Sequence, residues 1–209
     1  MRFWVGTRSG WGSPGLRQRA ISSKCRRRCS KSSRDEKLLQ AFAKHYQTGD
    51  ILPTELIQNL KRASSFGRAD WVRTQLYYTT LSLDLHDRDA VGIDPDAITH
   101  ELYLSFQPWT WLEGSKMYAS FGHLMGYSSN YYTYMFDKVI ALDFFAQFDP
   151  ANLLGGNAGE RYRKTVLEQG GSKPGKELVR DFLGRDEEFA AFAKWLNEEF
   201  EEQLPAASC

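Results

Sequence analysis

Cysteine and long apolar runs are both scarce in this sequence, and each absence excludes a class of protein. The 209 residues include three cysteines. Cys25 and Cys29 lie in a basic stretch and Cys209 is the last residue, so no even set of cysteines spans the chain. We therefore expect reduced thiols and an intracellular, cytoplasmic protein. No run reaches the roughly 18 apolar residues of a transmembrane helix, so we expect no membrane partner.

Histidine is also rare, and this limits the metal sites that the sequence can build. The four histidines are His45, His86, His100 and His123. No two are four residues apart, so one helical face cannot offer two imidazoles to a metal ion. The nearest approach to a His-Glu-x-x-His pattern is residues 100–104, which end in Leu instead of His.

Acidic residues are missing from the first 34 positions, which contain ten Lys or Arg. The remainder has 17 basic and 26 acidic residues, so a formal charge of +10 precedes a charge of −9. Residues 1–34 show no periodic apolar pattern, and we expect a disordered basic arm. Three interpretations stay open. The arm is a transit peptide for mitochondria or another organelle, a patch for nucleic acid or nuclear targeting, or the product of a truncated gene or misassigned start.

From residue 35 onward the apolar residues recur at helical spacing, which predicts an all-α domain over residues 35–203 and a short tail, 204–209. Gly49, Gly67 and the pair Asp94-Pro95 serve as predicted helix boundaries. The expected helices cover residues 38–49, 53–66, 69–86, 95–106, 131–148, 160–167, 177–183 and 186–200. The helix at 131–148 is the most apolar, so we expect it at the centre of the fold.

Residues 121–136 hold the densest group of polar aromatic side chains. On a formal helix, His123, Tyr127, Tyr131 and Tyr134 fall within an arc of roughly 80°, whereas Tyr132 points away. A neutral imidazole and a phenol can both donate hydrogen bonds to a developing negative charge. The alternative is that these rings simply pack at the edge of a core.

Several segments together resemble the thimet oligopeptidase family of zinc metallopeptidases, which includes neurolysin and oligopeptidase A. The matching segments are residues 42–49, 65–68, 121–136, 161–163, 170–172 and 181–185, and the resemblance extends from about residue 35 to 200. It implies the helical carboxy-terminal lobe of a neurolysin-like catalytic domain. It also implies that His123, Tyr127, Tyr131 and Tyr134 contact the peptide, with His123, Tyr131 and Tyr134 stabilising the tetrahedral intermediate.

The same resemblance implies a zinc ion held by a His-Glu-x-x-His helix and a distant Glu, and this sequence has no such helix. We therefore expect a carboxy-terminal fragment of a metallo-oligopeptidase acting on short peptides, with no zinc ligands of its own. Its partners would be short peptides and a missing amino-terminal catalytic segment, and the isolated chain would be inactive. The alternative is a non-catalytic remnant or binding module that uses the basic arm on nucleic acid or acidic surfaces.

Overall fold

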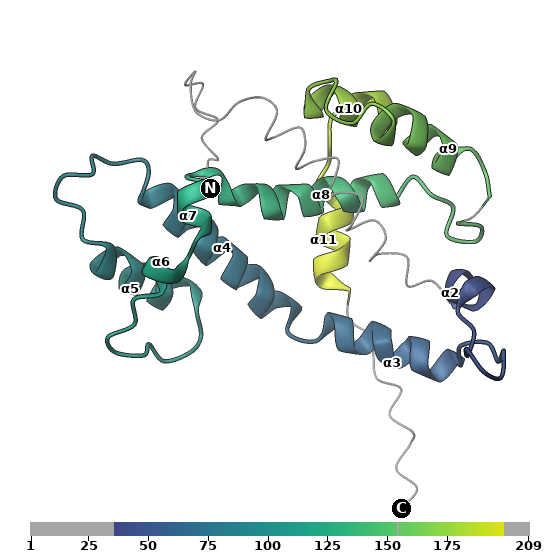
Figure 1. Cartoon of the computed structure of the whole chain (residues 1–209), viewed down its shortest axis with the longest axis horizontal. Helices are drawn as coiled ribbons and strands as arrows, with labels where there is room; N and C mark the ends of the chain where they lie inside the picture. Colours follow the sequence, from purple (N-terminus) through teal and green to yellow (C-terminus); the bar gives the residue numbers. More distant parts are fainter. Residues whose placement is uncertain (1–35, 154, 199–209) are drawn as a thin grey trace, which may run out of the picture.

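The computed structural model describes residues 36–153 and 155–198, and in these ranges the chain is helical, as expected (Figure 1). The predicted arm (1–34) and tail (204–209) lie outside the described residues. The elements in chain order are α2 (Glu36–Phe42), α3 (Thr54–Ser65), α4 (Arg68–Asp84), α5 (Pro95–Phe106), α6 (Met117–Ser120), α7 (His123–Gly126), the 3-10 turn η1 (Asn130–Tyr132), α8 (Thr133–Phe145), α9 (Ala158–Tyr162), the π-helical turn η2 (Arg163–Leu167), α10 (Gly175–Leu183) and α11 (Ala190–Asn197). In the described ranges no helix combines the length and apolar character needed to cross a bilayer.

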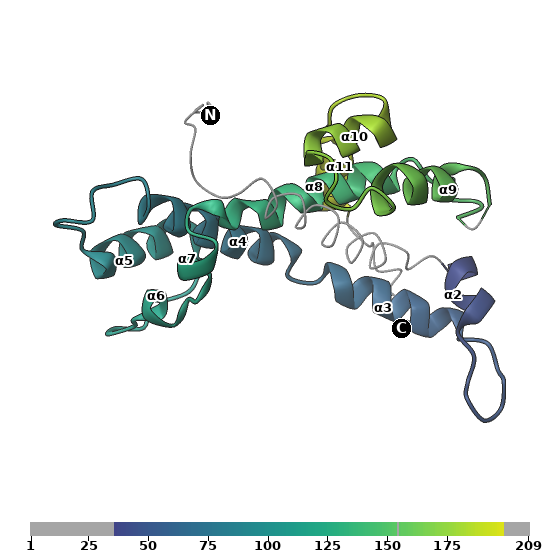
Figure 2. The same ribbon diagram turned by 45° about the horizontal axis from the view of Figure 1, so that its top comes forward.

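The helices α3 and α4 follow one another with a bend at Gly67, as the sequence predicts. Gly67 has a φ of +66°, a left-handed conformation that glycine adopts at little cost. Figure 2 shows α3 running away from the rest of the molecule, with α2 at its far end. The helices α2 and α3 therefore project from the body of the molecule.

The core of the body surrounds α8, which confirms the central position expected for this helix. Ile140, Phe144, Val166, Val179 and Phe182 are all almost fully buried there. The rings of Phe144 and Phe182 meet edge to face, with their centroids 4.8 Å apart. Burial of each such side chain contributes about 2 kcal/mol, so α8, η2 and α10 are held together mainly by apolar packing.

Helix α11 lies against α8 and is attached to the start of α4 through Trp195. The guanidinium carbon of Arg68 is 4.7 Å from the Trp195 ring centroid, and Nζ of Lys138 is 4.5 Å from it. Arg68 also donates hydrogen bonds to the carbonyl oxygens of Trp195 and Glu198. Two cations therefore contact one indole and join α4, α8 and α11.

The predicted helix at 38–49 is wrong beyond Phe42. The chain turns there, and the N–H of His45 donates to the carbonyl of Asp50 over 2.8 Å. The Thr48 N–H donates to Nδ1 of His45 over 3.2 Å, and Tyr46 is 87% exposed. Local side-chain hydrogen bonds of this kind compete with helix formation, which explains the early end of α2.

The helix predicted at 186–200 is also shorter in the structure. Residues 186–189 precede α11 because two of them bind groups outside this helix. The Asp186 carboxylate pairs with Arg180, and the backbone N–H of Glu188 donates to Asp143. Residues 199 and 200 lie outside the described part of the chain. The predicted helix at 131–148 corresponds to η1 and α8 and ends at Phe145.

Candidate functional site

The four residues predicted to share one helical face come from three consecutive elements. His123 begins α7, Tyr127 follows its last residue, Tyr131 lies in η1, and Tyr134 lies in the first turn of α8. A turn at residues 127–129 separates α7 from η1. The formal helix that describes their spacing is therefore not one continuous element in the structure.

The rings of these four residues nevertheless converge, and we call them the His–Tyr cluster. The His123 ring centroid lies 5.5 Å from that of Tyr127, 5.3 Å from Tyr131 and 5.7 Å from Tyr134. The rings of Tyr131 and Tyr134 are 4.8 Å apart. Tyr132, predicted to point away, is 39% exposed. The break in the helix preserves the grouping that the spacing predicts, while changing how the backbone achieves it.

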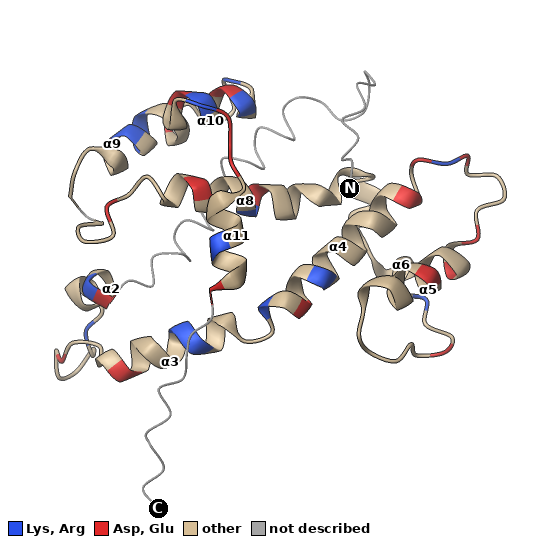
Figure 3. Ribbon diagram, turned by 180° about the vertical axis from the view of Figure 1, so that it is seen from behind, with Lys and Arg blue, Asp and Glu red and all other residues tan. Residues whose placement is uncertain are grey.

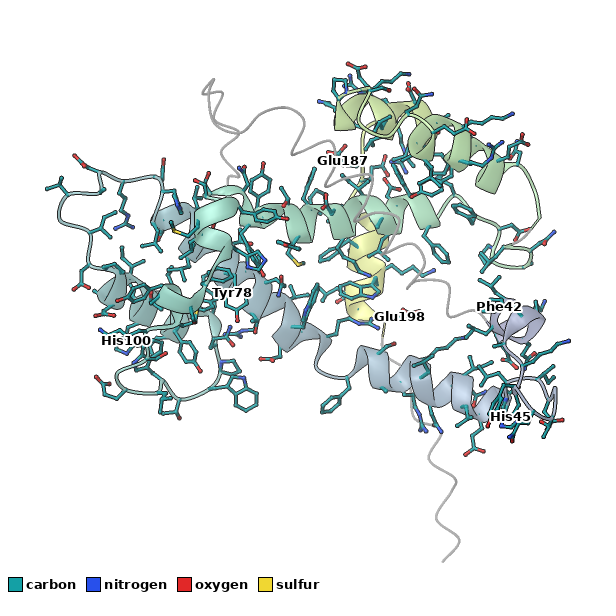
Figure 4. All side chains as sticks on the ribbon, in the orientation of Figure 1. Phe42, His45, Tyr78, His100, Glu187 and Glu198 are labelled. Atoms are coloured by element: carbon teal, nitrogen blue, oxygen red, sulfur yellow. The ribbon has the colours of Figure 1, made fainter. Side chains whose placement is uncertain are left out.

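Helix α4 packs against the His–Tyr cluster. Tyr78, labelled in Figure 4, packs edge to face against Tyr131, with the ring centroids 5.7 Å apart, and its ring is tilted against that of Phe121 at 5.0 Å. The Tyr131 hydroxyl donates to Oε1 of Gln75 over 3.4 Å, and Tyr131 is 7% exposed. Tyr131 is therefore fixed by both ring packing and a hydrogen bond.

The turn that carries Tyr127 is tied to the same helix. Ser128 has a φ of +51°, and its carbonyl accepts a hydrogen bond from the buried hydroxyl of Ser82. The N–H of Tyr127 donates to the His123 carbonyl over 2.8 Å. Sequence reasoning missed Ser82 and Gln75, because partners 46 and 56 residues away leave no local signal.

The cluster lies in a segment without Lys, Arg, Asp or Glu, residues 121–136, and Figure 3 shows the start of α8 without acidic or basic colouring. Nearby, burial raises the pKa of Tyr77 to about 12, and the phenols of Tyr78 and Tyr103 add to this effect. Tyr77 is therefore protonated at neutral pH. The chemistry available here is donation of neutral hydrogen bonds and contact with apolar groups.

The described residues do not fit a catalytic metal ion. They include no group of three or more His, Cys, Asp or Glu side chains that could hold one. His45 and His100 lie at opposite ends of the molecule in Figure 4. The His100 ring packs against Trp111 at 5.2 Å, and Nδ1 of His86 contacts the Ser82 carbonyl at 2.8 Å. These histidines are accounted for by packing and local contacts.

A buried ion pair lies on the other side of α8. Both carboxylate oxygens of Asp143 accept hydrogen bonds of 2.7 Å from Arg185, and one also accepts from the Glu188 N–H at 2.9 Å. Sequence reasoning did not identify Asp143, which sits among apolar residues of α8. Its partners belong to the connection between α10 and α11, so the pair serves to hold that connection against the core.

Comparison with known proteins gives one matching family model, described as Peptidase family M3, over residues 32–198. The chain is 29% identical over 153 residues to a mitochondrial intermediate peptidase of Arabidopsis thaliana, covering 73% of this chain and 22% of that protein. It is 31% identical over 157 residues to the organellar oligopeptidase A of the same plant, covering 71% and 20%, respectively. A probable cytosolic oligopeptidase A of that plant is 31% identical over 156 residues, covering 71% and 22%. The chain thus spans about a fifth of the length of these relatives.

Proposed function

This chain belongs to peptidase family M3, and from that premise we propose that it supplies the peptide-binding and oxyanion-stabilising part of a zinc-dependent oligopeptidase. The convergence of four polar-tipped rings in the His–Tyr cluster carries the proposal. The relatives are named as peptidases and oligopeptidases, which favours short peptides as substrates.

Attack on a peptide carbonyl places negative charge on its oxygen, and donors set in advance lower the energy of that state. His123 and either Tyr131 or Tyr134 are the proposed donors. Tyr131 is 7% exposed, whereas Tyr134 lies at the cluster's partly exposed edge. Tyr134 is therefore the better placed to meet the peptide, with Tyr131 supporting it. Tyr127 would close over the peptide from its turn.

The described residues include no group of three side chains that could hold a metal ion, so we assign this chain no step at the metal. The proposal requires that a segment outside this sequence provide the zinc ligands. The relatives' names include cytosolic, mitochondrial and chloroplastic forms, and we propose a cytoplasmic or organellar location on that basis.

A chimeric enzyme tests the proposal. Residues 36–198 would replace the matching region of the Arabidopsis probable cytosolic oligopeptidase A, with kcat and KM measured on an internally quenched peptide. We expect His123→Ala and Tyr134→Phe to lower kcat about 10²-fold, and Tyr131→Phe to lower it less. Thermal unfolding measured in parallel should change little.

The matched control is Tyr132→Phe, which removes a neighbouring phenol that is outside the cluster and exposed. It should leave kcat unchanged. If His123→Ala and Tyr134→Phe behave like this control in a chimera that is active, the cluster is only a packing feature and the proposed role is wrong.

A further inference from the structure

The turn between α7 and η1 has a backbone conformation that its sequence does not favour. Ser128 has a φ of +51°, in the left-handed region where a side chain is unfavourable. Such a residue persists only when its surroundings hold it, and residues of this kind concentrate at functional sites. Ser128 lies between Tyr127 and Tyr131, so its conformation sets how His123 and Tyr127 are placed relative to Tyr131 and Tyr134.

One stripe of α4 provides the contacts that hold this region. Gln75, Tyr78 and Ser82 are spaced three and four residues apart and therefore face the same side of the helix. Gln75 accepts from the Tyr131 hydroxyl, Tyr78 packs on the Tyr131 ring, and Ser82 donates to the Ser128 carbonyl. The stripe therefore contacts two of the segments that carry the cluster, η1 and the turn at residues 127–129.

Within this stripe, Ser82 has the position best suited to control the turn. Its side chain is almost completely buried, with the residue 1% exposed, and its hydroxyl is directed to the Ser128 carbonyl. Its own carbonyl is met by Nδ1 of His86 at 2.8 Å. Without the Ser82 hydroxyl, the part-buried carbonyl of Ser128 would lose this donor, and the turn would favour a different conformation.

We propose that Ser82 is a positioning residue, whose hydrogen bond to the Ser128 carbonyl fixes the left-handed turn and so holds His123 and Tyr127 beside Tyr131 and Tyr134. Its importance for peptide binding rests on the proposed function. Its effect on the arrangement of the rings does not, and the two can be measured separately.

The test uses the full 209-residue chain labelled at histidine for NMR. Because four aromatic rings surround His123, its ring resonances report whether Tyr131 and Tyr134 stay beside it. Ser82→Ala should shift the His123 resonances toward those of an exposed histidine. Thr79→Ala, which removes a hydroxyl bonded within α4 itself, should leave them in place.

A second substitution separates positioning from general stability. Glycine adopts the left-handed conformation readily, so Ser128→Gly added to Ser82→Ala should recover much of the shift. Unchanged His123 resonances in Ser82→Ala, or no recovery in the double variant, would overturn the proposal. If Ser82→Ala does not fold, Ser82→Cys gives the same comparison, because a thiol of similar size donates only weakly.

Binding of a fluorescein-labelled octapeptide of Ala, Phe and Gly residues gives the link to function. We expect Ser82→Ala to weaken it roughly three- to tenfold, and the double variant to recover part of that loss. Resonance shifts with no octapeptide binding by the unmodified chain would support Ser82 as the turn's anchor and count against the proposed function. Octapeptide binding by the unmodified chain, with no resonance shift in Ser82→Ala, would support the proposed function and count against Ser82 as the turn's anchor.

Discussion

Asp143 is a buried carboxylate whose charge is kept by its partners. Burial would raise the pKa of Asp143, but hydrogen bonds from Arg185 and the Glu188 N–H outweigh burial and hold that pKa below its ordinary value. A carboxyl whose pKa is lowered by folding stabilises the fold above its unfolded pKa of about 4. This stabilisation is lost as pH falls through the lower, folded pKa.

We predict that Asp143→Asn lowers the free energy of unfolding by about 2 kcal/mol at pH 7. This is below the roughly 3–5 kcal/mol of a fully buried pair, because the Arg185 side chain is 36% exposed. Urea titrations at several pH values measure the difference, which should shrink below about pH 4. Asp181→Asn, which breaks an exposed pair with Lys173, is the control and should change little. A difference that persists undiminished at low pH would contradict the assignment.

The residues of the candidate site were predictable from the sequence, although their support was not. Spacing alone grouped His123 with Tyr127, Tyr131 and Tyr134, because an interrupted helix keeps much of the angular order of a continuous one. Ser82 reaches the site only through tertiary folding, and a buried serine in a helix has no distinguishing pattern. The chemical roles of the four cluster residues stay predictions.

Helix boundaries with local chemistry were also predictable. Asp94 begins α5 as expected, and its carboxylate accepts from the N–H groups of Asp96 at 3.0 Å and Ala97 at 3.2 Å. Boundaries set by distant partners were not predictable, as at residues 186–189. Burial was harder still: Trp71 and Leu76 have helical spacing typical of a core, yet each is 39% exposed. Periodicity identifies an apolar face without stating what covers it.

The cap of α5 gives a prediction at this scale. Asp94→Ala should lower the free energy of unfolding by about 1 kcal/mol, because two amide groups lose their acceptor. Asp94→Asn keeps an oxygen acceptor and should be almost neutral. Chemical denaturation of both variants measures the effect, and equal destabilisation would show that the charge of Asp94 matters more than its capping oxygen.

At the scale of the whole molecule, the clearest expectation is that this chain cannot hold a zinc ion by itself. We predict that the 209-residue chain binds no stoichiometric zinc and hydrolyses no peptide, since its described residues offer no set of three ligands. Equilibrium dialysis with metal analysis, and a quenched-peptide assay with and without chelator, check this. The full-length Arabidopsis probable cytosolic oligopeptidase A serves as the positive reference. Tight zinc binding by this chain, or turnover that chelator abolishes, would refute the prediction.

The projecting helix α3 gives a second prediction at the scale of the whole molecule. Leu56 and Leu60 of α3 are 55% and 43% exposed, and exposed apolar faces promote association. We expect the double variant Leu56→Gln/Leu60→Gln to reduce self-association in sedimentation velocity experiments. The control is Val91→Gln. Val91 lies in a loop away from α3 and is 87% exposed, so this change should leave self-association as it was. An unchanged association in the double variant would show that α3 is not responsible.

The contacts of Trp195 with Arg68 and Lys138 also determine when this protein can finish folding. Arg68 and Trp195 are 127 residues apart. At about 5–20 residues per second, a ribosome needs roughly 6–25 s to add that length. Throughout this interval the start of α4 lacks the helix that covers it. The order of synthesis therefore makes the closure of α4, α8 and α11 a late event, and leaves the growing chain accessible to chaperones until Trp195 emerges.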